Sequence, residues 1–187
     1  MTESSNRRGK HRRYADRRIA ALLQVHEVLF HDACDPNCAN RLLQVLQDDF
    51  EVDRAAFLRP SEGPDNGLQV PFRSGDWGDA PLAAQMTGDG IDALIRIHRQ
   101  ASGALTLSRF RQPSVFEASA WDALWTKNML HPASALLSVS IDAPGDRGGF
   151  LFLILNGTSR EWSSHDRDLA EETAAILAVA TSRSRLF

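Results

Sequence analysis

The sequence predicts one α+β domain that contains antiparallel hairpins. Segments near both ends of the chain carry apolar residues three and four positions apart, the spacing of one helix face. Two compact apolar runs, 135–141 and 150–155, are separated by a turn-rich stretch, as in an antiparallel hairpin. The length of 187 residues suits a single core, because a chain of this size buries about two-thirds of its unfolded surface.

The composition excludes several classes of protein. A chain that is 43% hydrophobic and 24% charged is expected to fold. Its most apolar run, 149–155, is far shorter than the roughly 20 residues of a membrane helix. No signal-peptide pattern follows the polar residues 1–18. Two cysteines are too few for a disulfide scaffold, so we expect a soluble, cytoplasmic protein.

The charge is unevenly distributed along the chain. Residues 1–18 hold seven basic and two acidic residues, a net charge of +5, and the remainder holds 14 basic and 22 acidic residues, a net charge of −8. We interpret residues 1–18 as a disordered basic arm and 19–187 as the folded domain. Contact of the arm with nucleic acid is an alternative function. A solvated arm is favoured, because Tyr14 is its only aromatic residue and no nucleic-acid-binding motif accompanies it.

Two helices are expected at the start of the domain. The first covers about 13–30 and places a set of residues along one side: Ile19, Leu22, Leu23, His26, Leu29 and Phe30. Asp35 and Pro36 are a typical start for the second helix. Its apolar residues are Leu42, Leu43, Val45, Leu46 and Phe50.

A strand is expected at 55–58, followed by a turn-rich loop at 61–67 and a partner strand at 68–72. Pro71 favours an edge position for the partner strand, because proline lacks the N–H that a central strand needs. Glycines interrupt the middle of the chain. We expect two helices there, 91–100 and 118–129, with a short strand at 104–107 between them.

The final helix has a clear start signal. Ser163 or Ser164 is expected to cap it, and Asp166 and Asp168 suit its positive N-terminal end. Its predicted buried stripe consists of Leu169, Ile176, Leu177 and Ala180.

Three stretches in the last third resemble the GAF family of sensory domains: Ser134 to Ile141, Gly149 to Leu155, and Arg160 to Asp166. The resemblance covers about 19–185. It implies a central antiparallel sheet with helices on both faces and with the N- and C-terminal helices packed together. One set of helices would cover a small-molecule pocket, and the terminal helices would form a homodimer. The residues expected at that dimer interface are Ile19, Leu22, Leu23, His26, Leu29, Leu169 and Ile176.

An aromatic-rich set is the candidate pocket lining, because ligand sites are mainly apolar with a few polar groups. Its members are Phe72, Trp77, Phe116, Trp121, Trp125, Met129 and His131. Ordinary core packing is an equally weighted interpretation of this set. Relatives that bind cyclic nucleotides carry Asn-Lys, then Phe, then Asp-Glu, whereas here Gly157 follows Asn156 and Arg167 follows Asp166. Relatives that attach a bilin use a cysteine in the middle region, which this chain lacks. Neither a cyclic nucleotide nor a bilin is therefore expected, and the ligand and any cofactor are left unassigned.

No catalytic or metal-binding residues are predicted. His26, His31, Cys34 and Cys38 are chemically suited to zinc or iron. Pro36 interrupts any shared helical face, however, so buried thiols at a helix junction are favoured. The sequence Ser164-His165-Asp166 contains the residue types of a catalytic triad, but adjacent residues in a helix point in different directions. It is therefore interpreted as a helix cap.

The predicted function is therefore a non-enzymatic sensor that signals to a partner protein or output domain. Besides nucleic-acid contact through the arm, two alternatives stay open. One is a ligand-free dimerisation module. The other is a redox enzyme similar to the free methionine sulfoxide reductases that resemble GAF domains, which is weakened by the upstream position of both cysteines.

Overall fold

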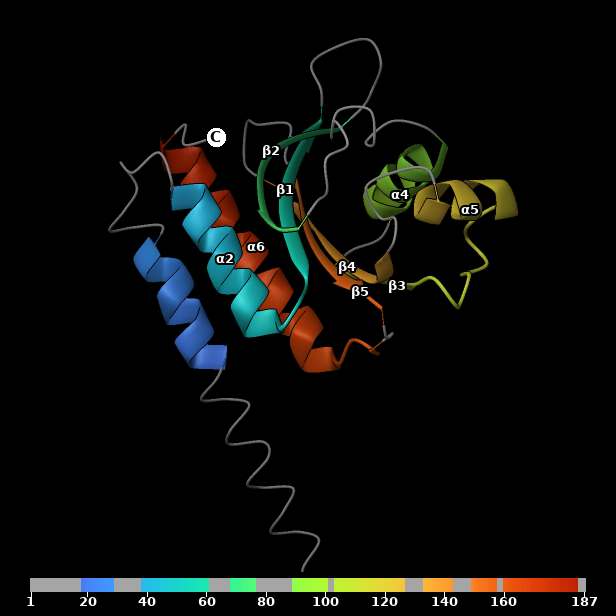
Figure 1. Cartoon of the computed structure of the whole chain (residues 1–187). Helices are drawn as coiled ribbons and strands as arrows, with labels where there is room; N and C mark the ends of the chain where they lie inside the picture. The colour runs from blue at the N-terminus through green and yellow to red at the C-terminus, as the bar shows by residue number, and fades with distance from the viewer. Residues whose placement is uncertain are drawn as a thin grey trace, which may run out of the picture.

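The computed structural model describes residues 18–28, 38–60, 68–76, 89–100, 103–126, 133–142, 149–157 and 160–184. An N-terminal helix covers residues 18–28. The remaining elements, in chain order, are α2 (Cys38–Phe50), β1 (Arg54–Pro60), β2 (Leu68–Gly75), α4 (Asp89–Gln100), β3 (Leu105–Ser108), α5 (Ala118–Thr126), β4 (Ala133–Ile141), β5 (Gly149–Asn156) and α6 (Ser164–Ser184). Figure 1 shows their arrangement.

The five strands form one sheet in the order β2-β1-β5-β4-β3, and every neighbouring pair is antiparallel. The predicted hairpin is confirmed as β4 and β5, which pair from Ala133↔Asn156 to Ile141↔Gly149. β2 lies at the edge of the sheet, the position that Pro71 predicted. The α+β prediction is therefore confirmed.

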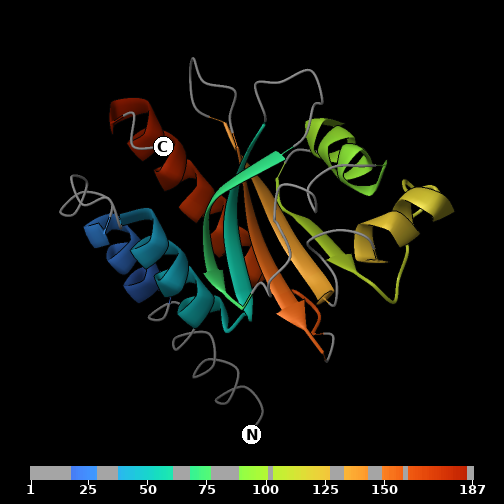
Figure 2. The ribbon, with the colours of Figure 1, turned by 45° about the horizontal axis from the view of Figure 1, so that its top comes forward.

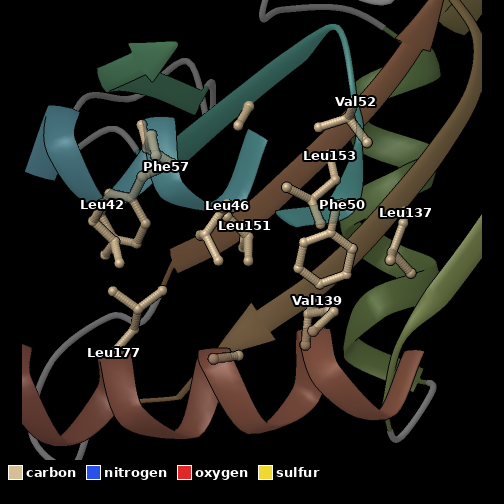
Figure 3. Close-up of a cluster of buried hydrophobic side chains, with 14 of the residues drawn as sticks. Leu42, Leu46, Phe50, Val52, Phe57, Leu137, Val139, Leu151, Leu153 and Leu177 are labelled. Atoms are coloured by element: carbon tan, nitrogen blue, oxygen red, sulfur yellow. The ribbon is translucent and has the colours of Figure 1, made fainter. Parts of the chain in front are cut away.

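Helices cover both faces of the sheet. The helix of residues 18–28, α2 and α6 lie on one side, and α4 and α5 lie on the other (Figures 1 and 2). Successive strand residues point to opposite faces. Leu137 and Val139 of β4 therefore belong to the core beneath α2 and α6, whereas Leu136 belongs to the core beneath α4 and α5. Figure 3 shows the first core, where side chains of α2, β4 and β5 meet Leu177 of α6.

The helix of residues 18–28 packs one face against the domain and exposes the other. Ala21, Val25 and Val28 are buried, and Val25 and Val28 are part of the core beneath α2 and α6. Ile19 and Leu23 are 58% and 63% exposed. Arg18 pairs with Glu172 of α6 through Nη2 and through Nε, the latter 3.0 Å from Oε2. Arg18, which we assigned to the basic arm, thus belongs to the described helix, and it joins the N-terminal helix to α6.

Local sequence explains how α6 and α4 are positioned. The Ser163 hydroxyl oxygen accepts from Asp166 N at 3.1 Å, and Ser163 N donates to Asp166 Oδ2 at 2.8 Å, so Ser163 caps α6. Gly90 in the first turn of α4 allows close contact with α5, because a Cβ there would lie 2.5 Å from Leu124 N. No helix within the described ranges is long and apolar enough to cross a membrane.

Candidate functional site

The face of the sheet beneath α4 and α5 contains a buried polar pair. His98, near the end of α4, is 4% exposed, and Ser138 of β4 is fully buried. His98 Nε2 lies 2.6 Å from Ser138 Oγ. The Phe150 ring lies against the imidazole with a centroid separation of 5.2 Å. Burial lowers the pKa of His98 to about 4, against an opposing effect of the Asp142 carboxylate, so the imidazole is neutral at pH 7.

The other ring nitrogen of His98 has unused hydrogen-bonding capacity. His98 Nδ1 is buried and has no hydrogen-bond partner among the described residues. In a neutral imidazole one nitrogen donates and the other accepts. Nδ1 is therefore a donor if Ser138 donates to Nε2, and an acceptor if Nε2 donates to Ser138. A buried polar group without a partner costs about 1–3 kcal/mol, which a bound ligand can recover.

Three of the predicted pocket residues come together on this face. Phe116, Trp121 and Trp125 are buried within the α4/α5 core. Phe116 and Trp121 pack edge to face at 5.0 Å, and Trp121 and Trp125 do so at 5.4 Å. Trp125 Nε1 is a second buried polar atom with no hydrogen-bond partner in the described part of the chain. This face thus combines aromatic rings with two unused polar nitrogens.

The other members of the predicted set do not join this group. Phe72 pairs with Phe57 across β1 and β2 and packs against the core beneath α2 and α6. It therefore lies on the opposite face of the sheet from Trp121. Trp77, Met129 and His131 lie outside the described residues.

His98 and Ser138 were not among the site residues predicted from the sequence. His98 follows Ile91, Leu94 and Ile95 by seven, four and three residues, which places it on the apolar side of α4. Ser138 occupies an inward position in the alternation of β4. A polar residue at a core position of each element was the available signal.

Asn156 and Asp166, which were compared above with the cyclic-nucleotide signature, take part in the framework of this fold. Arg54 Nη2 donates to Asn156 Oδ1 at 2.9 Å, and Asn156 N donates to Asp53 Oδ2 at 2.7 Å. These bonds join the start of β1 to the end of β5. Burial lowers the pKa of Arg54, against the opposing effect of Asp53 and Asp76.

The Asp166 carboxylate accepts hydrogen bonds from Ser163 N and Ser163 Oγ, both at 2.8 Å, and pairs with Arg160 at 3.3 Å. The residues Ser164, His165 and Asp166 therefore belong to the capped first turn of α6. No group of three or more potential metal ligands occurs within the ranges the structure describes. Cys38 begins α2, which covers the face opposite α4 and α5, and His31 and Cys34 lie outside the described residues.

The predicted dimer residues divide into two groups. Ile19, Leu23 and His26 are exposed on the N-terminal helix, and Leu22 is half-buried. Leu169 and Ile176 are half-buried and pack against the domain's own core. Leu29 lies outside the described residues. On α6, Val179 is 46% exposed.

Comparison with known proteins gives matches in structure only. No protein-family model matches the sequence, and no curated protein matches it. One similar structure is a far-red absorbing dark state with bound biliverdin IXa, at a TM-score of 0.68 and 13% identity, covering 90% of this chain and 99% of that one.

Two further structures extend the comparison. The GAF domain of a putative sensor histidine kinase from Pseudomonas syringae pv. tomato has a TM-score of 0.59 and 17% identity, covering 97% and 96% of the two chains. The phycocyanobilin-bound GAF domain of a cyanobacterial phytochrome has a TM-score of 0.67 and 12% identity, covering 89% and 96%. This chain therefore has the fold of a GAF domain.

Proposed function

We propose that this chain is a non-enzymatic sensory domain that binds a small molecule between the sheet and the helices α4 and α5. The observation that carries the proposal is the buried, neutral His98, whose Nδ1 has no hydrogen-bond partner in the described part of the chain. Buried polar atoms in proteins nearly always have partners. A ligand with one hydrogen-bonding group would supply the missing partner.

The chemistry of this face restricts the ligand. Phe150, Phe116 and the two tryptophans offer flat apolar surfaces, which favour a planar, largely apolar molecule. A neutral imidazole and an indole N–H favour a carbonyl or ring nitrogen over an anionic group. Two of the similar structures contain bilins, which makes a bilin one candidate ligand. A bilin would have to bind here without a thioether from Cys38, because α2 lies on the other face.

Ligand binding on this face would require movement. Leu94, Leu124 and Trp125 are at most 2% exposed, so a ligand enters by displacing α4 or α5 from the sheet. The protein would then exchange between one arrangement with α4 and α5 packed on the sheet and one with a helix displaced. A ligand shifts this equilibrium only by the difference in its affinity for the two arrangements. The central strands β4 and β5 contribute side chains to both cores, and so connect this displacement to α6.

We further propose that the protein is cytoplasmic, that it forms a homodimer through the N-terminal helix and α6, and that it acts on a separate output partner. Ile19 and Leu23 are one helical turn apart and exposed. The Arg18–Glu172 pair joins their helix to α6, so a shift of α6 would move the proposed interface.

The test is native mass spectrometry of the full chain purified gently from cells, for the wild type and for H98A and S138A variants. A dimer with a bound small molecule that the two variants lose supports the proposal. A dimer without ligand in every preparation indicates a dimerisation module instead. A bare monomer would contradict both parts and direct attention to nucleic-acid contact through residues 1–18.

A further inference from the structure

The segment that follows β3 forms a tight turn with an unusual sequence, Ser108-Arg109-Phe110-Arg111. Arg111 N donates to Ser108 O at 3.0 Å, which closes a β-turn with Arg109 and Phe110 at its centre. Arg109 N also donates to Ser134 O of β4 at 2.9 Å. The backbone of the turn is therefore fixed to the sheet, whereas its central side chains project from it.

The chain beyond the turn is fixed as well. Phe116 N donates to Pro113 O at 3.1 Å, and the Gln112 side chain donates to Phe116 O at 2.9 Å. Phe116 is 4% exposed and packs against Trp121 in the α4/α5 core. The segment 109–116 is thus fixed at both ends. Binding a partner therefore costs this segment little additional backbone entropy.

The exposed side chains of this segment do not serve its own packing. Phe110 is 72% exposed, the highest value among the large apolar side chains that the structure describes, and Val115 is 65% exposed. The centre of a turn usually carries Gly, Asn, Asp or Ser. Phe110 at this position neither stabilises the turn nor enters the core, so its ring is available for contact with a partner.

The charges beside Phe110 indicate the kind of partner. Arg109 and Arg111 are exposed, and neither guanidinium forms an ion pair with any residue in the described ranges. Residues 103–116 contain these two arginines and no acidic residue, whereas residues 19–187 carry a net charge of −8. The two arginines attract anionic groups, but a long polyanion such as nucleic acid would also face the acidic remainder of the domain. A short acidic segment contacts the arginines alone and is therefore favoured.

We infer that the turn of residues 108–111 is a docking site for an acidic segment of a partner protein that presents an apolar side chain between carboxylates. The apolar side chain covers Phe110, and the carboxylates bind Arg109 and Arg111, whose planar guanidinium groups suit bidentate pairing. Arginine and aromatic residues are also the types that contribute most at interfaces. The inference does not depend on whether α4 and α5 hold a small molecule.

The location of the turn is compatible with the proposed dimer. The connection from β3 to α5 lies on the side of the molecule away from the helix of residues 18–28 and α6 (Figures 1 and 2). Pairing through those helices would therefore leave the turn accessible on both protomers.

The experiment is selection from a random-peptide phage library on the immobilised full chain, followed by titration of the selected peptides. We expect peptides with Asp or Glu on both sides of an apolar residue. F110S should weaken their binding about tenfold or more. The R109E/R111E variant should lose these peptides and select basic ones in their place, because reversed charges reverse the preference.

Two controls match the charge-reversal variant. R96E and R99E each change an exposed arginine of α4, away from the turn and from the proposed dimer interface. Both should bind the selected peptides as the wild type does. The inference is overturned if no acidic consensus emerges, if F110S binds equally well, or if the wild-type turn binds single-stranded DNA or anionic vesicles more tightly than the peptides.

Discussion

His98 Nε2 of α4 lies 2.6 Å from Ser138 Oγ of β4, and this is a buried polar contact between a helix and the centre of the sheet. It links the element that would move on ligand entry to a strand that contributes to both cores.

We predict that S138A destabilises the domain by about 1–3 kcal/mol, because both ring nitrogens of His98 are then buried without partners. The double variant H98L/S138A should recover much of this loss, since two apolar groups leave no polar atom unpaired. Urea unfolding of the wild type, S138A, H98L and the double variant gives the coupling energy between the two residues. Additive effects of the two substitutions would contradict a specific pair.

The stability of the domain should depend on the protonation of His98. Its pKa is about 4 in the folded protein, against an ordinary value of 6.5 for the unfolded chain. Between these values the unfolded chain binds more protons, so the free energy of unfolding rises with pH across this window and falls as the pH is lowered. A pKa difference of this size corresponds to roughly 3 kcal/mol.

The measurement is urea unfolding at several pH values between 4 and 7, for the wild type and for H98Q. We expect the difference between the two proteins to shrink as the pH falls, because glutamine does not titrate. Parallel stability profiles would show that His98 has no depressed pKa.

Different parts of this structure could be predicted from the sequence to different extents. The hairpin of β4 and β5 was predictable because both strands are continuous apolar runs with a turn between them. The inward face of the N-terminal helix was not. Ala21, Val25 and Val28 repeat with the same spacing as the larger Ile19 and Leu23, and only packing against the sheet selects between the two faces.

The candidate site shows a similar division. Trp121 and Trp125 share one face because they are four residues apart on a helix, which the sequence predicts directly. Phe72 was placed with them, but the pairing register Phe57↔Phe72 turns it toward the other core. A shift of one residue in register reverses the face of every side chain in a strand. The sequence of β2 alone does not specify that register.

Gly90 should be required for the packing of α4 against α5. A Cβ at this position would lie 2.5 Å from Leu124 N, a backbone atom that cannot move without α5. We expect G90A to lower stability by about 1–3 kcal/mol, as overpacking does. D92A, at an exposed position in the same turn, is the control and should cost less than about 1 kcal/mol. Thermal unfolding of both variants tests this, and equal stability of G90A and the wild type would contradict the close contact.

The start of α6 provides a test between two neighbouring serines. Ser163 Oγ accepts from Asp166 N, so S163A should cost about 1 kcal/mol. S164A replaces an exposed residue of the first helical turn and should have a smaller effect. Chemical unfolding distinguishes them, and a larger loss in S164A would assign the cap to the other residue.

The proposed dimer is tested most directly on the N-terminal helix, because this helix separates exposed apolar residues from buried ones. L23E and I19E change side chains that make no use of the domain's own core. We expect each to dissociate the dimer while leaving thermal stability of the monomeric fold within about 0.5 kcal/mol.

V25A removes a fully buried side chain on the inward face and should lower stability by about 1–3 kcal/mol without directly altering the interface. Sedimentation velocity over a range of protein concentrations measures association, and circular dichroism measures folding. Persistence of the dimer in L23E and I19E would place the interface on another surface and leave the exposure of these two residues unexplained by self-association.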